Sequence, residues 1–195
     1  MTHMRTFPSV ILFFVLGSFS TSWTSGQESS QLPRSSAHNV RIEHRLSVKK
    51  VAKGATFQVA VVLDIAGGWH INSHRPTSEY LIPTNLELAS KEGMIITDIR
   101  YPKGQLEKLG FSDQPLDVYQ GSVTIFVSVR VSEKFADAGD TLRGKLRVQA
   151  CDDKMCLAPS AIDIAIPVSF GEPTESVESV NEDVFLAYKT EDFQT

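Results

Sequence analysis

The chain has 195 residues, 42% of them hydrophobic, which is enough for one domain with its own core. Its 19 basic and 23 acidic side chains give a formal net charge of −4. That balance excludes the basic surface that nucleic acids and anionic membranes attract, so we expect no nucleic-acid partner.

The first 26 residues have the pattern of a secretory signal. Arg5 supplies a positive charge, residues 8–19 form an apolar run, and small residues follow at 20–26. The apolar run is shorter than the roughly 20 residues that a membrane-spanning helix needs, which favours a cleaved signal over an uncleaved anchor. No later segment is long and apolar enough to span a bilayer. We therefore expect an exported mature chain without a membrane span.

A polar, Ser-rich stretch at 27–37 is predicted to be a flexible tether, because it has too few apolar residues to form a core. Residues 38–170 then alternate between apolar and polar side chains, the pattern of half-buried strands. The strands are predicted at 40–48, 57–65, 69–72, 85–88, 95–101, 123–131, 141–150 and 160–170. Seven or eight short strands without a long helical period predict one all-β domain, an antiparallel β-sandwich.

The last segment, 171–195, is acidic and is predicted to be a flexible tail, with 184–188 as a short element able to dock. Trp69 is expected to belong to the sandwich core.

The chain has two cysteines, Cys151 and Cys156, on either side of a four-residue turn between two predicted strands. Opposed positions of an antiparallel pair lie within disulfide range. A bridge that closes a six-residue loop stabilises a fold by only about 2 kcal/mol, against about 4.7 kcal/mol for a 100-residue loop. Disulfides persist outside the cytoplasm. We interpret the pair as a disulfide that opens and closes, that is, a redox pair.

Alternation along 142–150 places Cys151 out of phase with the core residues, so its thiol is expected to face outward and to be accessible to a partner. The neighbouring Asp152 and Asp153 disfavour a thiolate, whereas Lys154 favours it.

Two other interpretations remain open. The first is an interaction module in which the bridge is an inert staple. The second is a zinc or copper carrier, in which His70 and His74 join the two cysteines and Met155 adds a soft ligand.

Three stretches resemble the N-terminal periplasmic domain of the thiol:disulfide interchange protein DsbD, a domain that also occurs in stand-alone disulfide-corrector proteins. The most specific is QACDDKMCLAP at 149–159, which is supported by GWHINSH at 68–74 with Pro76 and by YQG at 119–121. The resemblance covers about residues 40–170. It implies an immunoglobulin-like sandwich in the periplasm with thiol:disulfide interchange activity, an oxidoreductase chemistry that needs no cofactor or metal.

The resemblance also implies roles for residues. Cys156 corresponds to the cysteine that forms mixed disulfides with partners, and Cys151 would resolve them. Phe111 matches the aromatic ring of a cap loop, and His70 and Tyr119 are expected to shape the site. The implied partners are thioredoxin-like periplasmic proteins and a membrane thiol reductase.

The chain departs from the family pattern in two ways. Four residues rather than five separate the cysteines. Leu109, Gly110, His70 and Asn72 stand where the family has acidic residues before the cap aromatic and a pair of tyrosines.

Overall fold

The computed structural model describes residues 35–90, 92–135, 139–171, 177–190 and 193–194. These residues belong to a compact unit, Pro33–Thr195. The predicted signal at 1–26 lies outside the described residues. No helix within the described ranges is long and apolar enough to cross a membrane.

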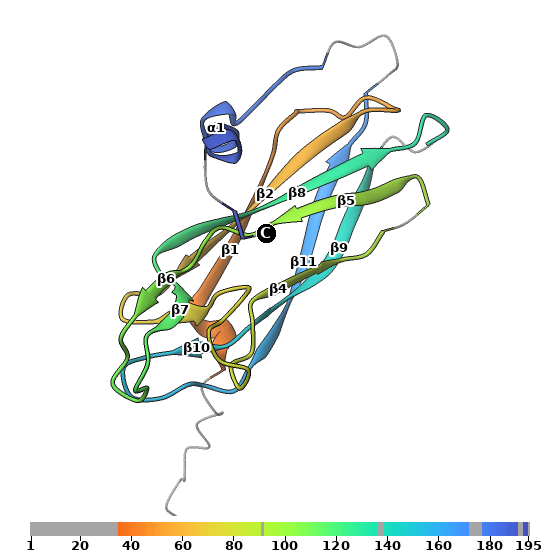
Figure 1. Ribbon diagram of the computed structural model, residues 1–195. Helices are drawn as coiled ribbons and strands as arrows, with labels where there is room; N and C mark the ends of the chain where they lie inside the picture. Colours follow the sequence, from red (N-terminus) through yellow and green to blue (C-terminus); the bar gives the residue numbers. More distant parts are fainter. Residues whose placement is uncertain (1–34, 91, 136–138, 172–176, 191–192, 195) are drawn as a thin grey trace, which may run out of the picture. The chain divides into compact units, whose positions relative to one another are not determined.

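Two antiparallel sheets form the sandwich (Figure 1). One has the order β1-β2-β8-β5, with β1 at Val40–Leu46, β2 at Thr56–Ile65, β8 at Ser122–Val131 and β5 at Met94–Arg100. The other has the order β11-β9-β4, with β11 at Ser160–Ser169, β9 at Gly139–Val148 and β4 at Asn85–Leu88. Their alternating side chains meet in one buried cluster that includes Val59, Val61, Leu142 and Leu146. The predicted immunoglobulin-like antiparallel sandwich is confirmed.

A third sheet, with the order β10-β3-β7-β6, lies at one end of the sandwich (Figure 1). Its strands are short: β10 at Ala150–Cys151, β3 at His70–Asn72, β7 at Leu116–Tyr119 and β6 at Gln105–Glu107. The sequence predicted β3, within 69–72, but not β6, β7 or β10, because strands of two to four residues show little or no period. We call this the site sheet, because Cys151 lies in it.

The predicted tether ends earlier than residue 37. Ser36–Asn39 form a 3₁₀ turn, η1, and Ser36 is fully buried. The Ser36 hydroxyl donates to the carbonyl of Ala158 at 2.6 Å and accepts from the backbone N–H of Ala150 at 2.9 Å. These bonds satisfy two backbone groups on either side of the cysteine hairpin. This serine is therefore part of the ordered domain.

The segment expected to be a flexible tail contains a helix, α1, at Glu182–Thr190. Phe185 of α1 packs against Ala60 and Phe126, which are paired on the outer face of the first sheet. Phe126 also meets the rings of Tyr188 and Phe193 edge-on, at 5.4 and 5.9 Å between centroids. The predicted docking element at 184–188 lies within this helix. Helix α1 orders because aromatic rings cover apolar residues that the sheet exposes on that face.

Candidate functional site: a disulfide hairpin beneath two loops

The two cysteines form a disulfide with an S–S distance of 2.04 Å and a Cα–Cα distance of 4.0 Å. They face each other as an antiparallel bridge at the base of a four-residue turn, as the spacing predicts. The backbone N–H of Asp152 donates to the carbonyl of Met155 at 3.0 Å, and Leu157 donates to Ala150 at 2.8 Å. The disulfide therefore closes a small loop that backbone hydrogen bonds also hold.

Asp152 gives the turn its shape. One oxygen of its carboxylate accepts the backbone N–H groups of Lys154 and Met155, both at 2.8 Å. These two hydrogen bonds hold the pKa of Asp152 below its ordinary value. The carboxylate adjacent to Cys151 is therefore ionised at neutral pH.

Cys151 pairs with His70 of β3 rather than continuing the pairing of β9 with β11. The change of partner occurs at Gln149, whose side-chain oxygen accepts from the Asn72 amide and from the Ile82 backbone, both at 3.1 Å. Gly68, with a φ of 78°, allows the tight turn from which β3 begins. These contacts set the hairpin against the site sheet.

The two faces of the site sheet have different surroundings. Ile71, Tyr119 and Ala150 face the main sandwich core. Their neighbours along the strands therefore face the other side: Cys151 is opposed to His70, and Asn72 to Val118. Val118 belongs to a separate buried cluster with Leu109 and Leu116, against which Leu81 packs. We call these four residues the site cluster.

The expectation that Cys151 is accessible is wrong, because the residue is 0% exposed. Alternation gave its direction correctly, away from the main core, but this second face is itself covered. His70 and Asn72 on the same face are 6% and 0% exposed. Cys156 is only partly buried, and its neighbours 153–155 are exposed. Of the two cysteines, Cys156 is the one with exposed surface.

Residues 108–115, between β6 and β7, form a loop that lies against the hairpin. Buried Leu109 anchors the loop, and a Cβ atom placed on Gly110 would lie 2.7 Å from the carbonyl oxygen of Asp153. The Lys108 ammonium donates to the carbonyls of Ser112, at 2.7 Å, and Asp113. Glycine at position 110 therefore lets the two backbones approach closely.

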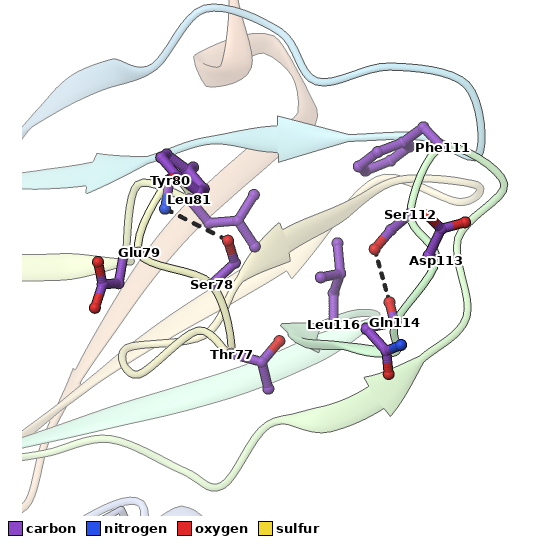
Figure 2. Close-up of a pocket in the computed structure, with 10 residues that line it drawn as sticks. All are labelled: Thr77, Ser78, Glu79, Tyr80, Leu81, Phe111, Ser112, Asp113, Gln114 and Leu116. Carbon is purple, nitrogen blue, oxygen red and sulfur yellow. Dashed lines mark hydrogen bonds between the residues drawn. The ribbon is translucent and has the colours of Figure 1, made fainter.

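Phe111 follows at the tip of this loop and is 39% exposed. Its ring lines a pocket of about 600 Å³, across from residues 77–81 of the segment between β3 and β4 (Figure 2). Leu81 and Leu116 of the site cluster also line it, and Tyr80, 93% exposed, comes from the opposite loop. The role of Phe111 as a cap over the sulfurs stays a prediction.

His70 has an unusual environment for an imidazole. Its Nε2 atom is buried and has no hydrogen-bond partner among the described residues. Burial lowers the pKa of His70, and the carboxylates of Asp153, Asp152 and Glu107 act in the opposite direction. The sequence resemblance marked His70 as a site-shaping residue but gave no sign that it would be buried.

Tyr119 lies on the core face of the site sheet. Its hydroxyl donates to the carbonyl of Pro102 at 2.8 Å and accepts the backbone N–H of His74 at 3.1 Å. Burial raises the pKa of this phenol. Tyr119 is the last residue of β7, and residues 120–121 form the turn into β8, which begins at Ser122. Its contacts hold the segment that follows β3.

The two histidines and two cysteines considered as metal ligands, with Met155 as a fifth, are engaged in other contacts or lie apart from one another as ligands. His74 stacks on Tyr101, with ring centroids 3.6 Å apart, and its Nδ1 lies 3.0 Å from the Thr84 carbonyl. The two sulfurs are bonded to each other. The described part of the chain holds no group of three or more His, Cys, Asp or Glu side chains suited to a metal ion.

The fold and the site together define an immunoglobulin-like sandwich with a disulfide hairpin at one end. The sequence matches the family described as "Thiol:disulfide interchange protein DsbD, N-terminal" over residues 41–167, so the chain belongs to that family and the resemblance is confirmed. No curated protein sequence matches the chain.

Two solved structures are similar. The N-terminal periplasmic domain of ScsB from Proteus mirabilis is 14% identical with a TM-score of 0.47, and the match covers 76% of this chain and 52% of that one. The N-terminal domain of Neisseria meningitidis DsbD in its reduced form is 13% identical with a TM-score of 0.36, covering 73% and 91%. The chain therefore spans about half the length of the ScsB domain structure.

Proposed function

We propose that this protein carries electrons by thiol–disulfide exchange through Cys151 and Cys156, in the periplasm after removal of a signal peptide. The proposed partners are a membrane thiol reductase that supplies electrons and thioredoxin-like or other oxidised proteins that receive them. Membership of the interchange family supports the chemistry in general. The observation that carries the proposal is a disulfide that bridges a six-residue hairpin in a domain with a large core of its own.

The energetics favour a bridge that opens. In the chain-entropy model the hairpin disulfide contributes about 2 kcal/mol, and the backbone hydrogen bonds of the turn do not depend on it. The main core lies on the opposite face of the site sheet from Cys151. Reduction should therefore leave the sandwich folded.

We assign the partner contact to Cys156 and the resolving role to Cys151. Exchange begins when a thiolate meets a sulfur in line with the S–S bond, so the attacked sulfur must be reachable. Cys156 is partly exposed and follows the exposed residues 153–155, whereas Cys151 is 0% exposed. The buried sulfur suits the second, intramolecular step, which needs no access for a partner.

The reduction potential of the pair tests the function. Equilibration with glutathione should give a potential well above the roughly −300 mV typical of structural bridges, with an unchanged far-ultraviolet circular dichroism spectrum. The Cys151→Ser/Cys156→Ser variant should lose only about 2 kcal/mol of unfolding free energy. A loss of several kcal/mol together with a very low potential would establish the staple instead.

Trapping tests the roles of the cysteines. Cys151→Ser leaves Cys156 free and should accumulate a mixed disulfide with a thioredoxin-like protein, identifiable by mass spectrometry. Cys156→Ser is the matched control and should trap little. The reverse pattern would exchange the two roles.

A further inference from the structure

His70 is a buried titratable side chain that the exchange chemistry above leaves without a role. It is the direct cross-strand neighbour of Cys151, and Cys151 is in turn opposed to Cys156. Directly opposed residues project on the same face with Cβ atoms about 4.5–5.5 Å apart. The three side chains thus form a row in the order His70, Cys151, Cys156. The Nε2 atom of His70 is buried without a hydrogen-bond partner among the described residues.

Cys151 needs a base in order to act as the resolving residue. The nucleophile in exchange is the thiolate, and both full burial and the adjacent Asp152 carboxylate disfavour that form. Solvent water reaches Cys151 poorly, because the residue is 0% exposed. A proton acceptor that is already on the same buried face removes this obstacle.

We propose that His70 takes the proton of the Cys151 thiol, through Nε2, when Cys151 resolves a mixed disulfide held at Cys156. The inference rests on the proposed exchange function and adds the group that makes its second step feasible. It concerns a residue at which this chain departs from the family pattern described above.

In this step a proton moves to His70 and an electron pair moves to the partner. A partner's disulfide has been attacked by the Cys156 thiolate, so that Cys156 is bonded to the partner's sulfur and the partner's other sulfur has left as a thiolate. The Cys151 S–H proton passes to His70, the Cys151 thiolate attacks Cys156, and the partner's remaining sulfur leaves with the electron pair. The partner gains two electrons, the Cys151–Cys156 bond forms, and His70 then releases its proton to the leaving thiolate or to water. Electron loading by a dithiol runs the same steps in reverse.

The electrostatics of the site suit a proton that is held briefly. Burial lowers the pKa of His70, which keeps the imidazole neutral and able to accept. The groups that act against burial are Asp153 and Asp152 from the hairpin and Glu107 from β6. These carboxylates favour the imidazolium once it forms, so they limit the cost of the transfer.

Stopped-flow reaction of the reduced protein with Ellman's reagent tests the proposal, because each exchange step releases a coloured thiolate. The first release depends on reagent concentration, and the second, intramolecular release reports resolution. We expect His70→Asn to slow the second release by about 100-fold at about pH 7, which is the size of effect that loss of a general base produces. The difference between the second-release rates of the two proteins should shrink as the pH rises toward about 10, because hydroxide increasingly ionises the Cys151 thiol without His70. His74→Asn is the control and should behave as the wild type.

Three results would overturn the role: an unchanged second release, a loss that is equal at every pH, or a loss confined to the first release. A measurement on the wild-type protein guards against misfolding of the variant. The ring proton resonances of His70 should titrate at different midpoints in the disulfide and dithiol forms, and equal midpoints would contradict the proposal. Neither measurement uses a protein partner, so failure to exchange with thioredoxin-like proteins would refute the proposed function without deciding the role of His70.

Discussion

The main sandwich core and the site cluster lie on opposite faces of the same short strands of the site sheet, but they differ in size and in the elements that form them. Ile71 and Tyr119 enter the main core, whereas Asn72 and Val118, one position away, face the site cluster. The main core draws on both sheets of the sandwich, and the site cluster joins β7 to two loops. A large core assembled from long strands opens only with global unfolding, whereas a small cluster under loops opens locally at lower cost. We therefore expect the main core to determine the stability of the domain and the site cluster to determine access to the disulfide.

The largest effect is expected in the main core. Leu146, 0% exposed on β9, is a main-core residue that pairs with Ile162 and Leu86 rather than with a residue of the site sheet. Leu146→Ala should lower the free energy of unfolding by about 2–5 kcal/mol, measured by urea denaturation, because it leaves a cavity. The rate at which glutathione reduces the folded protein should change little. Strong acceleration of reduction would show that the two clusters open together.

A substitution in the site cluster should have the opposite effect: a small change in the free energy of unfolding and a large change in the rate of reduction. Leu109 anchors the loop that lies against Asp153. Leu109→Ala should cost roughly 1–2 kcal/mol of global stability but should speed reduction by glutathione about tenfold or more, because the loop opens more often. Hydrogen exchange at the amides of 108–115 should rise in parallel. Faster reduction without faster exchange would mean that the cover acts by some other route than local opening.

Alternation of apolar and polar residues predicted only part of the difference between the two clusters. The long strands and the outward direction of Cys151 follow from a period of two residues. The burial of Cys151 does not, because its face of the site sheet is shared with the site cluster. Leu81 and Leu109 of that cluster come from loops without a period, at least 35 residues away along the chain. The change of sheet at Gln149 also leaves no local signal, since it depends on bonds to Asn72 and Ile82.

Both ends of the domain also make specific contacts that their composition did not predict. The serines at 35–36 are typical of a flexible tether in composition, yet both are bonded to the domain. The Ser35 hydroxyl bonds the Ser160 hydroxyl, and the Ser36 hydroxyl bonds the backbone on either side of the hairpin. The acidic tail carries enough aromatic side chains to cover Phe126, and this was visible only as the short apolar run at 184–188. Composition predicts average behaviour, whereas a few specific contacts decide whether a segment is ordered.

The smallest effect concerns the tip of the loop, Phe111. If its ring packs on the sulfurs, the contact is worth about 0.3–1.5 kcal/mol, so Phe111→Ala should speed reduction by glutathione about two- to tenfold. Tyr80→Ala is the matched control, because Tyr80 lines the same pocket from the opposite loop but is 93% exposed. It should leave the rate unchanged. Equal acceleration in both variants would mean that opening the pocket, rather than the Phe111 ring, governs access. No acceleration in either would leave Leu109 and its neighbours in the site cluster as the barrier, since they cover the face on which Cys151 lies.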